Sequence, residues 1–176
     1  MKFLHMAGKN LLKLSSFNTR GLGNAHKRRC VFQWLRQFHK GIILLQETHT
    51  TEALEKQWLK DWCGPIKFSH GTCCSRGVAI LFPKEFDVTI LNCVIDDNGR
   101  FILLDIIVEG QNFTVVNLYA PTKDKEEEQI RFIDFVLHTL EDYSDSNLII
   151  GGDLNTCLDP RIDKKGGTVE KMFHVC

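Results

Sequence analysis

Acidic, amide and phenol side chains follow several apolar segments of this sequence, at the points where predicted strands end. In chain order they are Asn18, Glu47, Tyr119, Asp153 and Asn155. Taken singly, each is also explained as an ordinary turn or surface residue. Loops at the ends of strands in packed α/β sheets supply ligand-binding side chains from a rigid support. We therefore expect these five residues to converge at one rim of the fold.

Carboxylates and amides in this combination suit the cleavage of a phosphodiester. Mg²⁺ prefers oxygen ligands and binds through one or two carboxylates together with waters and phosphate oxygens. Such a site needs a carboxylate that accepts a proton from the attacking water, and amide or phenol donors that hold the phosphate. The residues predict a metal-dependent phosphodiesterase, with Mg²⁺ as the cofactor and Mn²⁺ as a substitute.

Strand and helix patterns alternate in the part of the chain that must position the first two of these residues. Residues 11–17 and 41–47 have strand patterns, and each is followed by a segment with helical periodicity. The expected inward face of the first helix consists of Cys30, Val31, Trp34, Leu35 and Phe38. Thr51 is expected to cap the second helix, whose expected apolar side carries Leu54, Trp58, Leu59 and Trp62.

The middle of the chain changes to short strands separated by turn residues. The segments are "GVAILF", "FDVTILNCVI", "RFILLDIIVEG" and "NFTVVNLYAP", and they predict an antiparallel meander. Residues 125–143 then return to a helical pattern, with Ile130, Ile133, Leu137 and Leu140 expected to face inward. A further strand is expected at 147–152.

Together, β-α units and a meander predict an α/β fold with two packed mixed β-sheets flanked by helices, a four-layer sandwich. The segment after Asp159 has no strong strand or helix pattern. We therefore expect the second sheet to be incomplete at its C-terminal end. No linker or repeat divides the chain, which indicates a single domain.

The overall composition restricts how the chain could bind nucleic acid. Of its 176 residues 43% are hydrophobic, and Lys plus Arg equals Asp plus Glu at 22 each. Any phosphate contacts must therefore be local, because there is no global basic excess. The candidates are Arg20, Lys27, Arg28, Arg100 and the "RIDKK" segment at 161–165, for which solvated surface charge is the competing interpretation.

The cysteines and the hydropathy indicate a nuclear or cytoplasmic location. Seven cysteines form no CxxC pair and no zinc spacing, which predicts reduced and mostly buried thiols. No apolar run has the length or flanks of a secretory or transmembrane segment, so we expect no membrane association. No obligate protein partner is evident from the sequence.

Several of these segments, in their order and spacing, resemble the endonuclease/exonuclease/phosphatase superfamily, and within it the endonuclease domain of non-LTR (LINE-type) retrotransposons. The resemblance covers residues 11–163 and is carried by "SSFNTRGLGNAHKRR", "ILLQETHT", "RGVAILF", "GRFILLDI", "TVVNLYAPT" and "LIIGGDLNTCLDP". It implies a DNase I-like fold and an Mg²⁺-dependent enzyme that nicks one strand of target DNA.

The resemblance also implies a role for each of the five polar residues. By position, Glu47 resembles the metal ligand and Asn18 its neighbour in the metal shell. Tyr119 and Asn155 resemble residues that contact the phosphate and orient the water. Asp153 resembles the residue that activates the attacking water.

Two departures from the family pattern affect the expected activity. Arg20 stands where abasic-site repair nucleases usually have an aspartate, which disfavours a repair function. The family's closing Asp-His pair has no match, because His174 follows Phe173. We therefore expect residues 1–10 and 164–176 to be flexible or non-family ends, and a shortened copy that is weakly active or inactive.

Three alternatives to a retrotransposon endonuclease follow from the same resemblance. The first is a DNA nuclease of the exonuclease III or abasic-site type. The second is a non-catalytic remnant that at most binds metal or nucleic acid weakly. A phosphoinositide or sphingomyelin phosphatase is more distant, because the sequence shows neither a membrane-binding apolar loop nor a lipid pocket.

Overall fold

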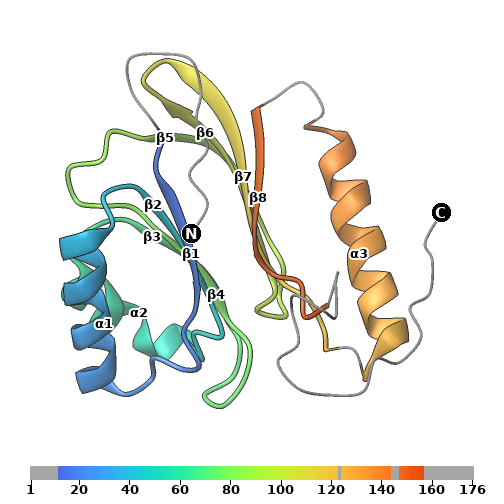
Figure 1. Ribbon diagram of the computed structural model, residues 1–176, viewed down its shortest axis with the longest axis horizontal. Coiled ribbons are helices and arrows are strands. Elements are labelled where there is room, and N and C mark those ends of the chain that lie inside the picture. The colour runs from blue at the N-terminus through green and yellow to red at the C-terminus, as the bar shows by residue number, and fades with distance from the viewer. Residues whose placement is uncertain (1–11, 123, 144–146, 157–176) are drawn as a thin grey trace, which may run out of the picture.

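The computed structural model describes residues 12–122, 124–143 and 147–156, which form two β-sheets packed face to face between helices (Figure 1). Helices α1 and α2 cover one sheet, and α3 lies on the far side of the other. This arrangement confirms the predicted fold class. The elements are β1 (Leu14–Asn18), α1 (Ala25–Phe38), β2 (Ile42–Gln46), a 3₁₀ turn (Glu52–Leu54), α2 (Glu55–Trp62), β3 (Ile66–Ser69), β4 (Val78–Leu81), β5 (Thr89–Ile95), β6 (Phe101–Val108), β7 (Gln111–Tyr119), α3 (Glu126–Glu141) and β8 (Asn147–Asp153).

The first sheet has the strand order β1-β2-β4-β3. β1 and β2 are parallel, and β4 is antiparallel to both β2 and β3. This corrects two sequence predictions: the "GVAILF" segment is not part of the meander, and β3 was not predicted. All four side chains of β4 are buried, and a short, wholly apolar strand carries no pattern that says which sheet it joins.

The second sheet has the order β5-β6-β7-β8. β5, β6 and β7 form the predicted antiparallel meander, and β8 returns parallel to β7 with Tyr119 opposite Asp153. The core between the two sheets is formed by apolar side chains of both, including Ile42, Leu44, Ile80, Ile102, Leu104 and Val115. This packing fixes the ends of β1, β2, β7 and β8 relative to one another.

The buried face of α1 differs from the predicted one. Its buried residues are Arg28, Phe32 and Leu35, whereas Trp34 and Phe38 are 44% and 60% exposed. The rings of Trp58 and Trp62 on α2 meet Phe32 edge-on and set the rotation of α1. Helical spacing alone does not reveal that an arginine belongs to the inward face.

Helix α3 also packs differently from the prediction. Its contacts with the second sheet come from Phe132, Val136, Leu140 and the following Tyr143, and the ring of Phe135 meets Phe101 edge-on. Of the predicted inward residues only Leu140 belongs to this set, while Ile130, Ile133 and Leu137 are exposed. Both kinds of position are apolar at helical spacing, so the pattern fits more than one face.

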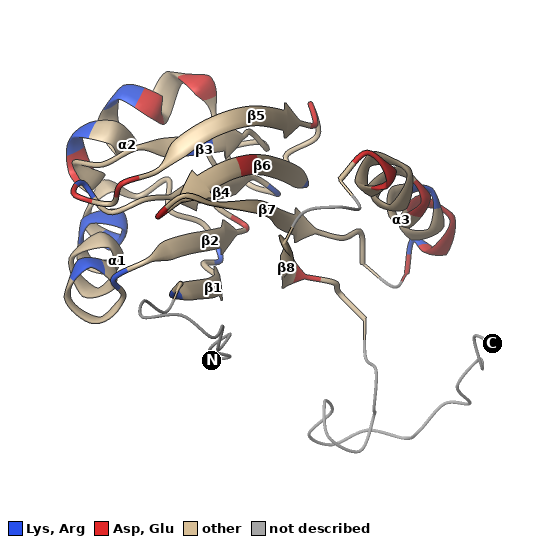
Figure 2. Ribbon diagram, turned by 90° about the horizontal axis from the view of Figure 1, so that it is seen from above, with Lys and Arg blue, Asp and Glu red and all other residues tan. Residues whose placement is uncertain are grey.

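Charged residues lie on the helices and in the loops, whereas the strands are largely uncharged (Figure 2). Among the residues that the structure describes, no helix is both long and apolar enough to cross a membrane. The predicted phosphate contacts at 161–165 and residue His174 lie outside the described residues.

Candidate active site

The five predicted site residues meet at the rim where β1, β2, β7 and β8 end. The side-chain amide nitrogen of Asn18 donates to Oε1 of Glu47 and to Oδ2 of Asp153, at 2.9 Å each. The Tyr119 hydroxyl donates to the same Glu47 oxygen at 3.1 Å. The backbone N–H of Asn155 donates to Oδ1 of Asp153 at 3.0 Å. The predicted convergence is therefore confirmed, with the two carboxylates bonded to a single amide group.

Parallel pairing of strands within each sheet explains this convergence. β1 and β2 run together in register, so Asn18 lies opposite Gln46 and next to Glu47. β7 and β8 do the same in the other sheet, and the Ala120 N–H donates to the Asp153 carbonyl at 2.9 Å beyond the last pair. Each sheet thus supplies one carboxylate to the rim; the first adds Asn18, and the second adds Tyr119 and, just beyond β8, Asn155.

A buried polar network joins the two sheets directly behind the site. The amide of Gln46 donates to Oδ1 of Asn117 at 2.7 Å. The amide of Asn117 donates in turn to the carbonyls of Leu45 and Ala79, at 3.0 and 2.9 Å. Asn117 is fully buried. The network fixes the spacing between the sheets one residue away from Glu47, and buried networks of this kind are rigid when all members are satisfied.

Unusual backbone conformations gather at the same rim. Seven non-glycine residues in the described chain have positive φ, and five of them border the site: Arg20, Glu47, His49, Arg76 and Asn155. Such conformations cost on the order of 1–3 kcal/mol each for a non-glycine residue and persist where the surroundings impose them. The strain therefore marks this rim as a place where side-chain direction outweighs local backbone preference.

Burial and hydrogen bonding set the ionisation of Tyr119. Burial raises the pKa of the phenol most, and the hydrogen bond and negative charge of Glu47 raise it further. A contact with Asn155 and the charge of Arg100 act in the opposite direction on this pKa. The guanidinium of Arg100 lies over the Tyr119 ring at 5.4 Å from its centre. The phenol therefore stays protonated at neutral pH and acts as a hydrogen-bond donor.

The donor set fits Mg²⁺ in the number and type of its ligands. The described residues contain no group of three or more Asp, Glu, His or Cys side chains that could hold a metal ion. Mg²⁺ nevertheless needs only one or two carboxylates, because waters and substrate phosphates complete its octahedron. Glu47 and Asp153 lie close enough to share the Asn18 amide, so a dication between them would offset their mutual repulsion.

The orientation of Asn18 is informative about its predicted place in the metal shell. Its Oδ1 accepts the backbone N–H of Arg20 at 3.1 Å, while its nitrogen faces both carboxylates. Rotating the amide would place an oxygen against two acceptors. In this structure Asn18 therefore bridges the carboxylates and does not present its oxygen to a metal.

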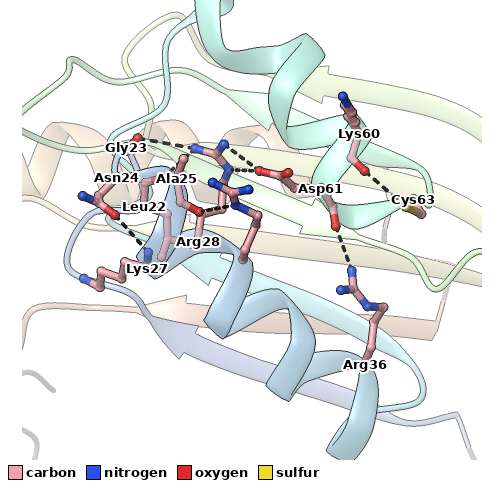
Figure 3. Close-up of polar contacts among 11 residues, drawn as sticks. Leu22, Gly23, Asn24, Ala25, Lys27, Arg28, Arg36, Lys60, Asp61 and Cys63 are labelled. Carbon is pink, nitrogen blue, oxygen red and sulfur yellow. Dashed lines mark hydrogen bonds and ion pairs between the residues drawn. The ribbon is translucent and has the colours of Figure 1, made fainter.

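The four basic residues predicted to contact nucleic acid have different surroundings. Arg28 is 1% exposed and pairs with Asp61 at 2.7 Å, so its guanidinium is not available to a phosphate and this prediction is wrong (Figure 3). Lys27 is exposed and donates to the carbonyls of Thr19 and Arg20, at 2.9 Å each. Arg20 is exposed beside Asn18. Arg100 contacts the Tyr119 carbonyl at 3.2 Å.

A cleft of about 470 Å³ adjoins the carboxylate of Glu47. Its lining combines the cations Arg76, Arg100 and Lys125 with His49 and with the two acids Glu47 and Glu128. Glu128 pairs with Arg100 at 3.3 Å and with Lys125 at 3.4 Å. Sequence reasoning missed Arg76 and Lys125 as members of this cleft. His49 is half-buried against Gly21. Arg76 begins the "RGVAILF" segment that carries part of the resemblance, but its positive φ and its place on the cleft cannot be read from a sequence.

These features define an α/β two-sheet protein with a polar site that both sheets supply. Residues 15–168 match the model of the Endonuclease/Exonuclease/phosphatase family, and the chain belongs to this family. The chain is 38% identical over 166 residues to an uncharacterized 149 kDa protein of transposon TX1 from Xenopus laevis. This match spans 92% of the chain but only 12% of the transposon protein. The resemblance seen in the sequence is thereby confirmed.

Solved structures with the same fold include DNA-processing proteins. A humanized TDP2 of D. rerio matches with a TM-score of 0.64 at 19% identity, over 84% of this chain and 67% of its own. D. rerio TDP2 complexed with a single-strand DNA product has a TM-score of 0.64 at 20% identity, covering 86% and 63% of the two chains. An AP endonuclease from Archaeoglobus fulgidus has a TM-score of 0.64 at 24% identity, covering 85% and 60%. At these identities the likeness establishes the fold.

Proposed function

We propose that this chain carries the catalytic face of an Mg²⁺-dependent phosphodiesterase that acts on DNA, as an endonuclease of the retrotransposon type. The observation that carries the proposal is the convergence of Glu47 and Asp153 on the amide of Asn18, with the Tyr119 hydroxyl on the same carboxylate. The match to a transposon protein supports the retrotransposon setting. A DNA substrate is supported by the fold-related TDP2 that was solved with a DNA product.

Each residue has a chemical task in this proposal. Glu47 would be the principal ligand for Mg²⁺, and the metal would supply positive charge to offset that of the phosphate and of the leaving oxygen. Asp153 accepts the proton of the attacking water, with its two oxygens held by Asn18 and Asn155. The Tyr119 hydroxyl would exchange its hydrogen bond to Glu47 for one to a non-bridging phosphate oxygen. The Asn155 amide donates to the Ala120 carbonyl at 2.7 Å, and its second N–H would donate to another such oxygen.

The cationic side chains of the cleft beside Glu47 support a polyanionic substrate. Arg76, Arg100 and Lys125 face a space of about 470 Å³ next to the site. Arg100 donates to the Tyr119 carbonyl and pairs with Glu128 at 3.3 Å, so its guanidinium is already oriented, and a flanking phosphate would replace Glu128 as its partner. The net charge of zero for the whole chain is compatible with this proposal, because the positive charge that would contact the phosphates is local to the cleft.

The test separates metal binding from cleavage. Mn²⁺ binding is followed by the proton relaxation of water, and cleavage is followed as Mg²⁺-dependent nicking of supercoiled plasmid. Glu47→Gln should abolish both Mn²⁺ binding and nicking. Asp153→Asn should weaken Mn²⁺ binding modestly and slow nicking by about 10²-fold or more. Glu109→Gln, an exposed carboxylate in the turn after β6, is the matched control and should change neither.

The expected rate depends on how much of the machinery this chain contains. Because the chain spans 12% of its transposon relative, nicking is measured for the 176-residue chain and for a fusion to the relative's following segment. Slow nicking by the chain and faster nicking by the fusion are expected. The proposed site would be refuted if the two variants, Glu47→Gln and Asp153→Asn, nicked DNA or bound Mn²⁺ as the unmodified chain does.

A further inference from the structure

Two adjacent thiols occupy the loop between β3 and β4, outside the constellation described above. Cys73 and Cys74 are both exposed, and their sulfur atoms lie 3.4 Å apart. This corrects the prediction that the thiols are mostly buried, because Cys30 and Cys63 are exposed as well. Only the Cys73–Cys74 pair brings two sulfurs into contact among the described cysteines.

The loop that carries this pair is tied to the backbone of the candidate active site. The N–H groups of Thr48 and His49 donate to the carbonyls of Gly77 and Arg76, at 2.9 Å each. Thr48 and His49 directly follow Glu47, so the loop and the metal-ligand segment share hydrogen bonds. Cys74 also lines the cleft that Glu47 borders. Only Ser75 separates Cys74 from Arg76, whose carbonyl accepts the hydrogen bond from His49.

A tight turn holds the two thiols next to each other. Thr72 donates its N–H to the carbonyl of Ser75 at 2.8 Å, and the two hydroxyls are 2.9 Å apart. The N–H of Cys74 donates to the Thr72 hydroxyl at 3.2 Å. The turn thus closes over the dipeptide and limits the separation of the sulfurs.

We propose that Cys73 and Cys74 form a reversible dithiol modification site, which a peroxide oxidises to an intramolecular disulfide and a thiol reductant restores. The thiolate of one cysteine attacks a peroxide oxygen, giving a sulfenic acid and, with hydrogen peroxide, releasing water. The neighbouring sulfur then attacks the sulfenic sulfur, forms the S–S bond and releases a second water. The two sulfurs together lose two electrons, which the peroxide oxygens gain.

The geometry makes such a disulfide easy to reduce. Consecutive Cα atoms are about 3.8 Å apart, below the usual separation of about 4.4–6.8 Å for bridged cysteines. The ring is therefore strained, and strained, exposed disulfides are the labile ones. Closing it also brings the sulfurs from 3.4 Å to about 2.05 Å, which must rearrange the turn next to Arg76. The hydrogen bond from Cys73 raises the pKa of Cys74, so its thiolate forms at higher pH than that of an ordinary cysteine, and oxidation should accelerate as the pH rises.

Trypsin provides a direct test, because Lys67 and Arg76 delimit a peptide that contains both cysteines and no other. The full chain is treated with hydrogen peroxide, alkylated and digested, and the peptide masses are measured by mass spectrometry. A second sample is reduced with dithiothreitol before alkylation. The expected 68–76 peptide is lighter by two hydrogen atoms, carries no alkyl group, and regains both alkylation sites after reduction. Cys73→Ser and Cys74→Ser should each prevent this loss, whereas Cys30→Ser should not.

Phenylarsine oxide tests the proximity of the two thiols independently of peroxide. Its arsenic forms bonds to both sulfurs with loss of one water, so one arsenical per chain should protect both cysteines of the 68–76 peptide from alkylation. Alkylation of either cysteine at the same rate with and without the arsenical would overturn the proposal. Independent oxidation of the two sulfurs to sulfinic acids, without an intramolecular disulfide, would overturn it as well.

Hydrogen exchange tests whether oxidation of the Cys73–Cys74 pair affects the backbone of the candidate active site. Amide hydrogen exchange in residues 47–50 should increase on oxidation of the unmodified chain and stay unchanged on oxidation of Cys73→Ser. This readout does not require nuclease activity, so failure of the proposed function would leave it intact. Equal exchange before and after disulfide formation would refute the coupling to the site.

Discussion

At the scale of single residues, Asn18 explains why two carboxylates can lie together before any metal binds. Its amide is the common donor to Glu47 and Asp153, at 2.9 Å each. An amide at this position reduces the repulsion between the acids without adding charge of its own. A third acid would increase that repulsion and would also add a potential ligand.

Asn18→Asp is therefore expected to destabilise the metal-free chain and to strengthen Mn²⁺ binding. The Coulomb cost of one additional charge about 4 Å from another is on the order of 1 kcal/mol in water-like surroundings. Urea unfolding in EDTA and in Mn²⁺ measures both effects, with Asn112→Asp, an exposed residue of β7, as the matched control. Equal destabilisation in EDTA and in Mn²⁺ would contradict a shared metal site.

Tyr119 gives the site a dependence on alkaline pH. Its pKa in the folded chain is raised, first by burial and then by Glu47. The unfolded chain therefore loses this proton at lower pH than the folded chain. The stability that Tyr119 contributes is fully present below the unfolded pKa of about 10 and is lost as the pH rises through the folded pKa.

The absorbance of tyrosinate tests this shift directly, because the chain has only two tyrosines. In Tyr143→Phe, the remaining phenol should titrate above the pH at which it titrates in urea. Tyr119→Phe should in addition flatten the loss of stability above about pH 10. Coincident titration in the folded and unfolded chains would show that Glu47 and burial do not act on this phenol.

At the scale of elements, an ion pair between the buried Arg28 and Asp61 joins α1 to α2. Nε and Nη2 of Arg28 donate to the same oxygen of Asp61, at 2.9 and 2.7 Å. Nη1 of Arg28 contacts the carbonyl of Leu22 at 3.2 Å, and the guanidinium lies 5.8 Å from the centre of the Trp58 ring. The pair thus holds the loop before α1, which connects the helix to Asn18.

Removing one partner of this pair should cost more than removing both. Asp61→Ala leaves the arginine, which is 1% exposed, without its counter-ion and should destabilise the chain by about 3–5 kcal/mol. The double variant Arg28→Met, Asp61→Ala should recover much of that loss, because no buried charge remains. Urea unfolding measures both, with Arg29→Met on the exposed side of α1 as control. Additive losses would mean that the pair does not act as a unit.

The order of most elements could be predicted from the sequence, whereas the faces of the helices could not. The strand ends that carry Asn18, Glu47 and Asp153 are marked by apolar runs that stop at polar residues, and the structure brings them together. The inward position of Arg28 depends on Asp61, 33 positions away, and local spacing does not contain this information. The cleft residues Arg76 and Lys125 lie far apart in the sequence, so local spacing does not predict that they line the same cleft.

At the scale of the whole molecule, the surface beside β8 and α3 is unusually apolar for the end of a sheet. β8 pairs with β7 on one side only within the described residues. Leu148 and Ile150 of β8 are 42% and 51% exposed, and Ile130 and Leu137 of α3 are 53% and 59% exposed. In Figure 1 the two elements stand side by side at the side of the molecule away from α1 and α2. An apolar strand edge of this kind invites pairing with another chain.

The isolated chain is therefore expected to self-associate as its concentration rises. Ile150→Lys places a charge on the β8 edge and Leu137→Glu places one on α3, and both positions are more than half exposed, so neither substitution removes core packing. Each should reduce the associated fraction in sedimentation velocity. Leu59→Glu, an exposed apolar position on α2, should leave that fraction unchanged because α2 lies on the opposite side of the sandwich. A chain that sediments as a monomer at all concentrations, and unfolds in one cooperative step, would show that this apolar surface is tolerated in water.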